Sequence, residues 1–216
     1  MSTTMSPTAD VKSLDAPITV NRRRIDQVLI GLGLVLTVAL AVAGALLMWG
    51  SNFAEDYVHD ELSSQNIFFP PAAALEEEGR TDLVKFAEKQ VTTGDHAEAY
   101  ASYIDGHLQE TADGMTYAEL GTPERAARAA VADAKEAGAS EEEIATLQGE
   151  LDTISNQRNT LFKGETLRGL LLSAYAWSTV GSIAGIAAIA ALVAAVAMAV
   201  LVVLGFVHMR RNHAKA

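Results

Sequence analysis

Cysteine is absent from the 216 residues, and proline occurs only five times. Without cysteine there is no disulfide, no thiolate metal site, no CxxCH haem attachment and no cysteine nucleophile. No stretch alternates apolar and polar residues over the length of a strand. We therefore expect an all-α protein, stabilised by helix packing alone.

Charged side chains are missing from two long stretches. Residues 28–49 are 22 positions without a charge, and residues 169–209 are 41. About 20 apolar helical residues cross a bilayer core, and a helix satisfies its own backbone polar groups there. The two stretches predict transmembrane helices, one at 25–50 and one within a long apolar helix at 169–209. A signal peptide is the alternative for the first, but its apolar run exceeds the roughly 7–15 residues typical of such peptides.

Basic residues lie at one end of each uncharged stretch. Arg22–Arg24 precede the first, whereas Arg210, Arg211 and Lys215 follow the second. Because Lys and Arg accumulate on the cytoplasmic side of spans, we expect cytoplasmic tails at 1–24 and 210–216 in a bacterial plasma membrane. The first tail is polar and predicted to be disordered.

The segment between the spans, residues 51–168, is acidic. It holds 24 acidic and 9 basic residues, a net charge of −15, and the whole chain carries −11. Nucleic-acid binding therefore has no electrostatic support. The charge could steer a cationic partner to this extracytoplasmic segment. Alternatively, it is a solvated surface, with glutamates at helix N-termini.

Several short patterns place helices in this acidic segment. Asp95 is a candidate N-cap for a helix that ends at Asp113–Gly114. Thr122-Pro123 is a typical helix start. Ser140 and Glu143 fit a capping box, so a helical hairpin is expected near 122–165.

The second apolar stretch is longer than one span requires. If 186–209 match the first span, residues 169–185 form about 25 Å of surplus apolar helix. One explanation is that Leu170, Leu171, Leu172 and Ala174 belong to the core of the outer domain. The other is that the surplus helix contacts a larger partner through Leu171, Tyr175 and Trp177.

Small residues recur along both predicted spans and would allow close helix packing. The partner helix could be the other span, a second copy of the chain or another protein. The candidate packing residues are Gly33, Thr37, Ala41, Ala45, Gly181, Gly185, Ala187, Ala191 and Ala195.

Recognisable reactive motifs are also missing. There is no nucleophile elbow, phosphate-binding loop or dinucleotide fingerprint. The clusters around His59 and His96 lack the spacing of a zinc site. Ionisable groups near mid-bilayer, which transport requires, are absent as well. We therefore expect a non-enzymatic protein without a cofactor or metal.

Two stretches, Ala99–Leu120 and Glu165–Gly181, resemble a group of small two-span actinobacterial membrane proteins. This group includes the respiratory supercomplex association factor, an accessory subunit of the menaquinol-oxidising cytochrome bcc–aa3 assembly. The hairpin at 122–165 looks like an insertion relative to the shorter members. The resemblance implies a subunit that binds no haem or copper itself and contacts other membrane subunits.

The expected function is thus a non-catalytic accessory or assembly subunit, with the respiratory supercomplex as the leading candidate. Its expected partners are the lipid bilayer and other membrane subunits, and self-association stays open. The alternative is an extracytoplasmic sensor or ligand-binding protein. Because the cytoplasmic tails are too short for an output domain, such a sensor would signal through a partner.

Overall fold

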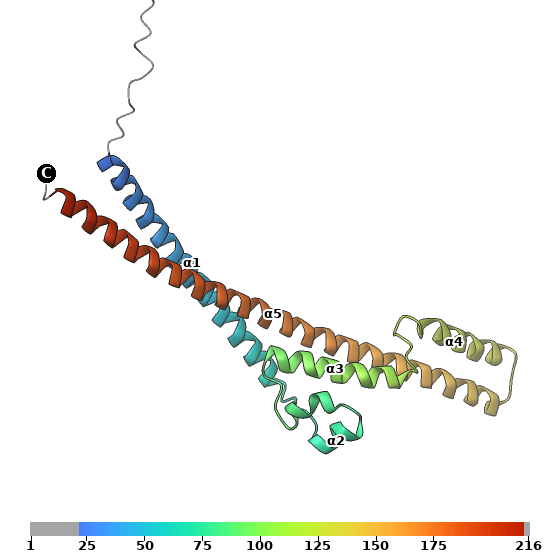
Figure 1. Ribbon diagram of the computed structural model, residues 1–216. Helices are drawn as coiled ribbons and strands as arrows, with labels where there is room; N and C mark the ends of the chain where they lie inside the picture. The colour runs from blue at the N-terminus through green and yellow to red at the C-terminus, as the bar shows by residue number, and fades with distance from the viewer. Residues whose placement is uncertain (1–21, 214–216) are drawn as a thin grey trace, which may run out of the picture. The chain divides into compact units, whose positions relative to one another are not determined.

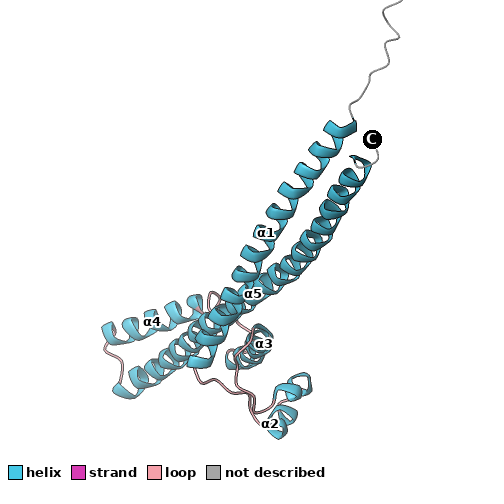
Figure 2. Ribbon diagram, turned by 90° about the vertical axis from the view of Figure 1, so that its left-hand side faces the viewer, coloured by secondary structure: helices cyan, strands magenta, loops and turns pink. Residues whose placement is uncertain are grey.

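The computed structural model describes residues 22–213, so residues 1–21 of the tail predicted at 1–24 and the last three residues lie outside the described part. Residues 22–24 and 210–213 of the predicted tails are not outside the helices but form the first turn of α1 and the last turn of α5. Every regular element within it is helical (Figures 1 and 2), which confirms the all-α class. The elements are α1 (Arg22–Ser64), α2 (Ala72–Glu77), the 3₁₀ helix η1 (Thr81–Phe86), α3 (Gly94–Thr111), α4 (Gly121–Glu136) and α5 (Glu141–His213).

Two helices, α1 and α5, are long and apolar enough to cross a membrane. Within their most apolar windows, only 6% and 11% of the residues are buried inside the chain. The core helix of a soluble protein would be mostly buried. The two helices are therefore compatible with membrane spans.

The second arm of the predicted hairpin and the long apolar stretch are one helix. α5 continues without interruption for 73 residues. It contains no proline, and a glycine inside a helix costs only about 1 kcal/mol relative to alanine. Gly164 and Gly169 therefore do not end it, and the expected boundary at 168–169 is not a helix boundary.

Two helix starts differ from the sequence prediction. α3 is capped by Thr93, whose Oγ1 accepts the His96 N–H at 3.2 Å, so Asp95 lies inside the first turn. α4 begins at Gly121, because the turn at 116–120 runs directly into it through the Glu124 N–H to Leu120 C=O bond. One of the two bonds of the predicted capping box is present: the Ser140 Oγ accepts the Glu143 N–H at 3.2 Å.

The chain divides into two compact units. In the first unit, residues 22–45 of α1 pack antiparallel to residues 189–213 of α5. A Cβ added at Gly33 would lie 2.8 Å from Cγ2 of Val202, and one added at Gly205 would lie 3.4 Å from Cγ1 of Ile30. Small residues thus allow these two apolar helices to approach closely.

The second unit, Leu46–Ala188, is called the outer unit below. Its main core lies where α1, α3 and α5 meet the loops at 65–71 and 87–93. Phe69 stacks on Phe86 and meets the edge of Tyr100, each at 5.3 Å between ring centroids. The buried residues of this core are Val58, Leu62, Phe69, Val91, Ala97, Ala101 and Leu171.

A smaller cluster holds the far end of α3 against α5. It consists of Leu108, Ala112, Leu120 and Leu161. α3 also approaches α5 closely at its start, where a Cβ added at Gly94 would lie 2.6 Å from the Ser178 Oγ. α3 is therefore fixed along α5 at both ends.

Candidate interaction surface

Three aromatic side chains form an exposed row along the outer half of α1. Trp49, Phe53 and Tyr57 follow one another at intervals of four residues, which places them on one side of the helix. Their rings stack at 5.8 and 6.2 Å. They are 68%, 57% and 51% exposed. The outer unit therefore presents a continuous aromatic edge, called the aromatic row below.

Next to the aromatic row, α1 and α5 enclose an open groove of about 330 Å³. Buried Val58, Leu62 and Leu171 contribute apolar groups to it. Its more exposed members include Tyr57 and Trp177. Polar groups also line it, on Glu61, Gln65 and Ser173. This apolar groove with a polar rim is suited to binding another apolar surface.

α5 adds large apolar side chains that no part of the outer unit covers. Leu170, Trp177, Val180 and Ile183 are all more than half exposed, at 65%, 56%, 57% and 62%. Contiguous apolar surface of this kind on a protein marks a site of contact with a partner or a membrane.

The predicted partner-contact residues have different environments. Leu171 is 2% exposed and lies in the main core, so it packs within the chain, and its assignment to a partner contact is corrected. Tyr175 is half-buried, and Trp177 is 56% exposed on the groove. The alternative, that 170–174 serve the outer core, holds for Leu171 but not for the exposed Leu170. The core explanation thus holds for the side of α5 that carries Leu171, and a partner contact on the exposed side stays a prediction.

The small residues predicted to pack on α1 do not all face α5. Gly33, Thr37 and Ala41 are partly buried, but Ala45 is exposed and Gly44 is buried instead. A step of four residues turns the helix by about 40° more than one full turn, so three steps move a side chain about 120° around the axis.

On α5, the predicted packing residues fall into two groups, buried or partly buried in one and exposed in the other. Gly181 and Gly185 lie against α1: added Cβ atoms would be 3.0 Å from the Ala54 Cβ and 2.8 Å from the Ser51 Oγ, respectively. Ala195 is buried and Ala191 partly buried, whereas Ala187 is exposed and Ala188 takes the buried position. Ala187 and Ala45 are therefore not packing residues within the part of the chain that the structure describes.

Sequence reasoning missed the aromatic row and Glu61 as surface features. The four-residue spacing of the aromatics was the available signal. The groove was not visible in the sequence because it is formed by residues more than 100 positions apart.

The histidines do not form a metal site in the described residues, where no group of three His, Asp or Glu side chains could hold an ion. His96 meets the rings of Phe69 and Phe86 at 6.3 and 5.4 Å. Burial, followed by the nearby Lys89 charge, lowers the pKa of His96. His107 Nε2 lies 3.8 Å from the Glu78 carboxylate, a partly exposed pair. Both histidines thus have contacts with neighbouring side chains of the outer unit.

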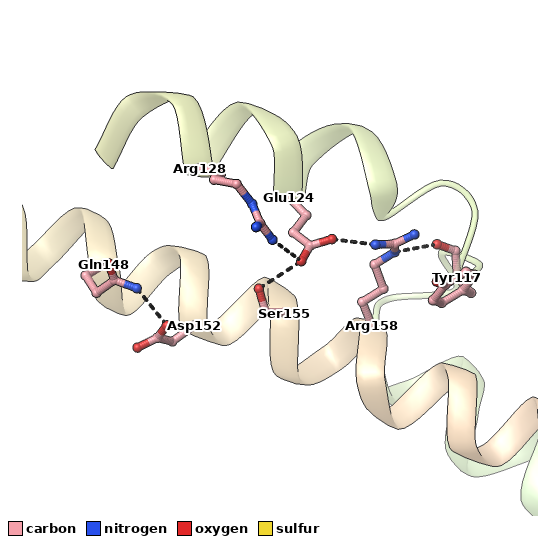
Figure 3. A network of polar contacts seen from close by, with 7 residues as sticks. All are labelled: Tyr117, Glu124, Arg128, Gln148, Asp152, Ser155 and Arg158. Carbon is pink, nitrogen blue, oxygen red and sulfur yellow. Dashed lines mark hydrogen bonds and ion pairs between the residues drawn. The ribbon is translucent and has the colours of Figure 1, made fainter. Parts of the chain in front are cut away.

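Away from the groove, one polar network joins α4 to α5 (Figure 3). The Glu124 carboxylate accepts hydrogen bonds from Arg158 at 2.6 Å and from Ser155 and Arg128 at 3.1 Å. The Arg158 guanidinium also lies 4.1 Å from the centroid of the Tyr117 ring. The network holds the helical hairpin together where few large apolar side chains are present.

The Glu124 network predicts that the hairpin loosens in acid. The hydrogen bond from Arg158, and then that from Ser155, holds the pKa of Glu124 below its ordinary value of 4.5. The ionised form therefore stabilises the folded hairpin above that pH, and this contribution is lost as pH falls through the lowered pKa. In Glu124→Gln, we expect weaker protection of the α4 amides at pH 7, relative to their intrinsic exchange rates, and a smaller further loss of protection on acidification than in wild type.

Glu150→Gln is the control for this measurement, because Glu150 is an exposed carboxylate on the same arm of α5. Its α4 exchange should match that of the wild type at each pH. Equal exchange in all three proteins would show that Glu124 does not hold the hairpin.

Comparisons of the chain with protein-family models, with curated proteins and with solved structures find no match. The function is therefore inferred from the surface of the outer unit and from the two apolar helices.

Proposed function

We propose that this chain is a non-catalytic accessory or assembly subunit of a bacterial membrane complex. In this proposal, α1 and α5 cross the plasma membrane, both termini are cytoplasmic, and the outer unit contacts other subunits outside the bilayer. The leading candidate for the complex is the actinobacterial cytochrome bcc–aa3 supercomplex, which the resemblance of Ala99–Leu120 and Glu165–Gly181 suggests.

One observation carries the proposal: the outer unit exposes a large apolar surface. The aromatic row, the groove and the exposed side chains of α5 lie in residues 46–188. Exposed aromatic side chains are typical of the central residues of protein interfaces. An interface role accounts for this surface better than solvent exposure does.

The membrane placement rests on length, composition and charge. Each long helix has an apolar window sufficient for a span. Arginines lie at the starting end of α1 and near the final end of α5, which the antiparallel pairing brings to the same side. The acidic residues 51–168 would then lie on the opposite side.

Purification from native membranes tests the proposal. The protein is extracted in mild detergent through a C-terminal tag, and the visible absorbance of the product is recorded. Because the chain has no cysteine for haem attachment and we expect it to bind no haem itself, a haem band would come from a co-purifying respiratory subunit. We expect such a band in stoichiometric amount.

The variant Trp177→Ala makes the test specific. Truncation of a central interface aromatic typically costs about 2 kcal/mol or more, which corresponds to about a 30-fold loss of affinity. The ratio of haem to protein should therefore fall strongly. Phe162→Ala is the matched control, because Phe162 on α5 is also 56% exposed but does not line the groove.

Two results would contradict the proposal. A colourless protein that migrates alone in native lipid particles would remove the accessory-subunit function. A colourless homo-oligomer that binds a small solute would instead favour the sensor.

A further inference from the structure

The groove between α1 and α5 carries a carboxylate, that of Glu61, among its apolar lining residues. Glu61 lines it, and the Glu61 carboxylate has no ion-pair or hydrogen-bond partner in the described part of the chain. None of the described lining residues is Lys, Arg or His. The Glu61 carboxylate thus lies beside apolar lining residues, without a counterion among the residues that the structure describes.

The surroundings reinforce this negative charge. Residues 46–79 contain seven carboxylates and no Lys or Arg. On α5, the nearest cation in sequence to the groove residues is Arg168, which is already paired with Asp105 and Glu165 at 3.5 and 3.1 Å. A ligand of the groove would therefore have to supply its own positive charge.

From these observations, we infer that the groove receives an apolar segment of a partner protein that carries a lysine or arginine facing Glu61. This inference rests on the proposed function and names the chemistry of the partner surface. The groove volume of about 330 Å³ is near the lower end of the range that encloses small ligands, so it suits a few side chains. The apolar groups would supply affinity, and the charge pair would fix the register.

A lipid does not fit this position as well. Tyr57 lies eight residues beyond Trp49, or about 12 Å along the helix, and the last apolar residues of the predicted span at 25–50 lie near Trp49. The groove therefore lies outside the hydrocarbon region if the proposed placement holds. The unpaired carboxylate would also repel the phosphate of an anionic lipid.

A second copy of the chain is disfavoured by charge. Two copies meeting at this surface would bring together two outer segments, each with a net charge of −15 over residues 51–168. Like charges juxtaposed at an interface cost several kcal/mol. A heterologous basic partner avoids this repulsion.

Site-specific photocrosslinking in the native cells tests the inference. The photoreactive residue p-benzoylphenylalanine replaces Trp177 in one strain and Phe162, which is equally exposed, in the control strain. Crosslinked peptides are sequenced by mass spectrometry. From position 177 we expect one apolar segment of an extracytoplasmic part of a membrane protein, with a Lys or Arg among its residues; position 162 should not give this segment.

Charge reversal then tests the predicted ion pair. Glu61→Lys should reduce the yield of that crosslink at least tenfold, and Glu61→Gln should give an intermediate loss. Asp60→Lys changes the net charge equally but alters a neighbour that does not line the groove, so it should retain most of the yield. Amide exchange of α3 serves as the check that each variant keeps its fold.

The outcomes separate this inference from the proposed function. Crosslinks to lipid, to a second copy or to an acidic segment would overturn the inference, as would no crosslink at all. If haem still co-purifies in those cases, the accessory-subunit function stands and the contact lies elsewhere. Equal effects of Glu61→Lys and Asp60→Lys would show that general charge, and not the groove carboxylate, directs binding.

Discussion

Phe69→Ala is expected to unfold the main core of the outer unit. Phe69 is only 2% exposed and packs against Phe86 and Tyr100. Removal of a buried phenylalanine ring typically costs about 3–5 kcal/mol, because the lost burial is added to the cost of the cavity. This is a large part of the 5–15 kcal/mol that stabilises a typical domain.

Hydrogen exchange measured by mass spectrometry would detect this loss. Circular dichroism is less suitable, because the two long helices dominate its signal. In Phe69→Ala, the amides of α3 and of residues 87–93 should exchange about 100-fold faster or more, in proportion to the lost free energy.

The adjacent residue provides the matched control. Phe68 is 53% exposed, so Phe68→Ala should change stability by no more than about 0.5 kcal/mol. The backbone bonds of this loop, from the Phe69 N–H to the Lys89 C=O and from the Val91 N–H to the Ile67 C=O, are kept in both variants. Equal exchange in the two variants would show that the Phe69 ring does not hold this core.

Gly181→Leu is expected to separate α1 from α5 in the outer unit. A Cβ at this position would lie 3.0 Å from the Ala54 Cβ and 3.4 Å from the Ser51 carbonyl oxygen. The backbone oxygen and the fixed Ala54 Cβ cannot rotate away, so the helices must move. Overpacking of this kind costs about 1–3 kcal/mol or more, and leucine adds three further carbons.

Spin labelling can measure the separation directly. Because the chain has no cysteine, two can be introduced at the exposed positions Phe53 and Ile183 without competing sites. The distance distribution between the labels should broaden and shift to longer values in Gly181→Leu. In Gly169→Leu it should stay unchanged, because nothing lies within 4 Å of a Cβ added there.

The position of Gly181 also changes how its variants are interpreted. Since the glycine packs on α1 of the same chain, loss of a partner in Gly181→Leu or Gly185→Leu would be secondary to the movement of α1. Trp177→Ala is the more direct test of the partner contact, because its side chain is exposed on the groove.

Local sequence patterns predicted the features that depend only on neighbouring residues. The two uncharged stretches predicted the apolar parts of α1 and α5, and the box at Ser140 and Glu143 predicted the start of α5. Asp95 is not the cap of α3, because the Thr93 side chain already accepts the His96 N–H in the first turn of that helix. Thr122 is not the cap of α4, because the preceding turn continues into the helix through the bond from the Glu124 N–H to the Leu120 C=O. The start of a helix is set by a few hydrogen bonds, and residues with similar capping ability compete for them.

Local sequence patterns could not predict which individual side chains of a helix are buried and which are exposed. Leu170 and Leu171 are adjacent leucines in the same apolar stretch, yet one is 65% and the other 2% exposed. Ala45 was predicted to pack, yet it is exposed and its neighbour Gly44 is buried, because one residue is about 100° of rotation around a helix.

The sequence by itself therefore determined that the chain is helical, that two stretches are apolar enough to span a membrane, and that the segment between them is acidic. Each of these is a property of composition along the chain. Only the tertiary structure decided which side of α5 is buried and that Glu61 lies on an apolar groove beside Trp177. The physical reason is that burial depends on which helix packs opposite, and that helix comes from more than 100 residues away in the chain.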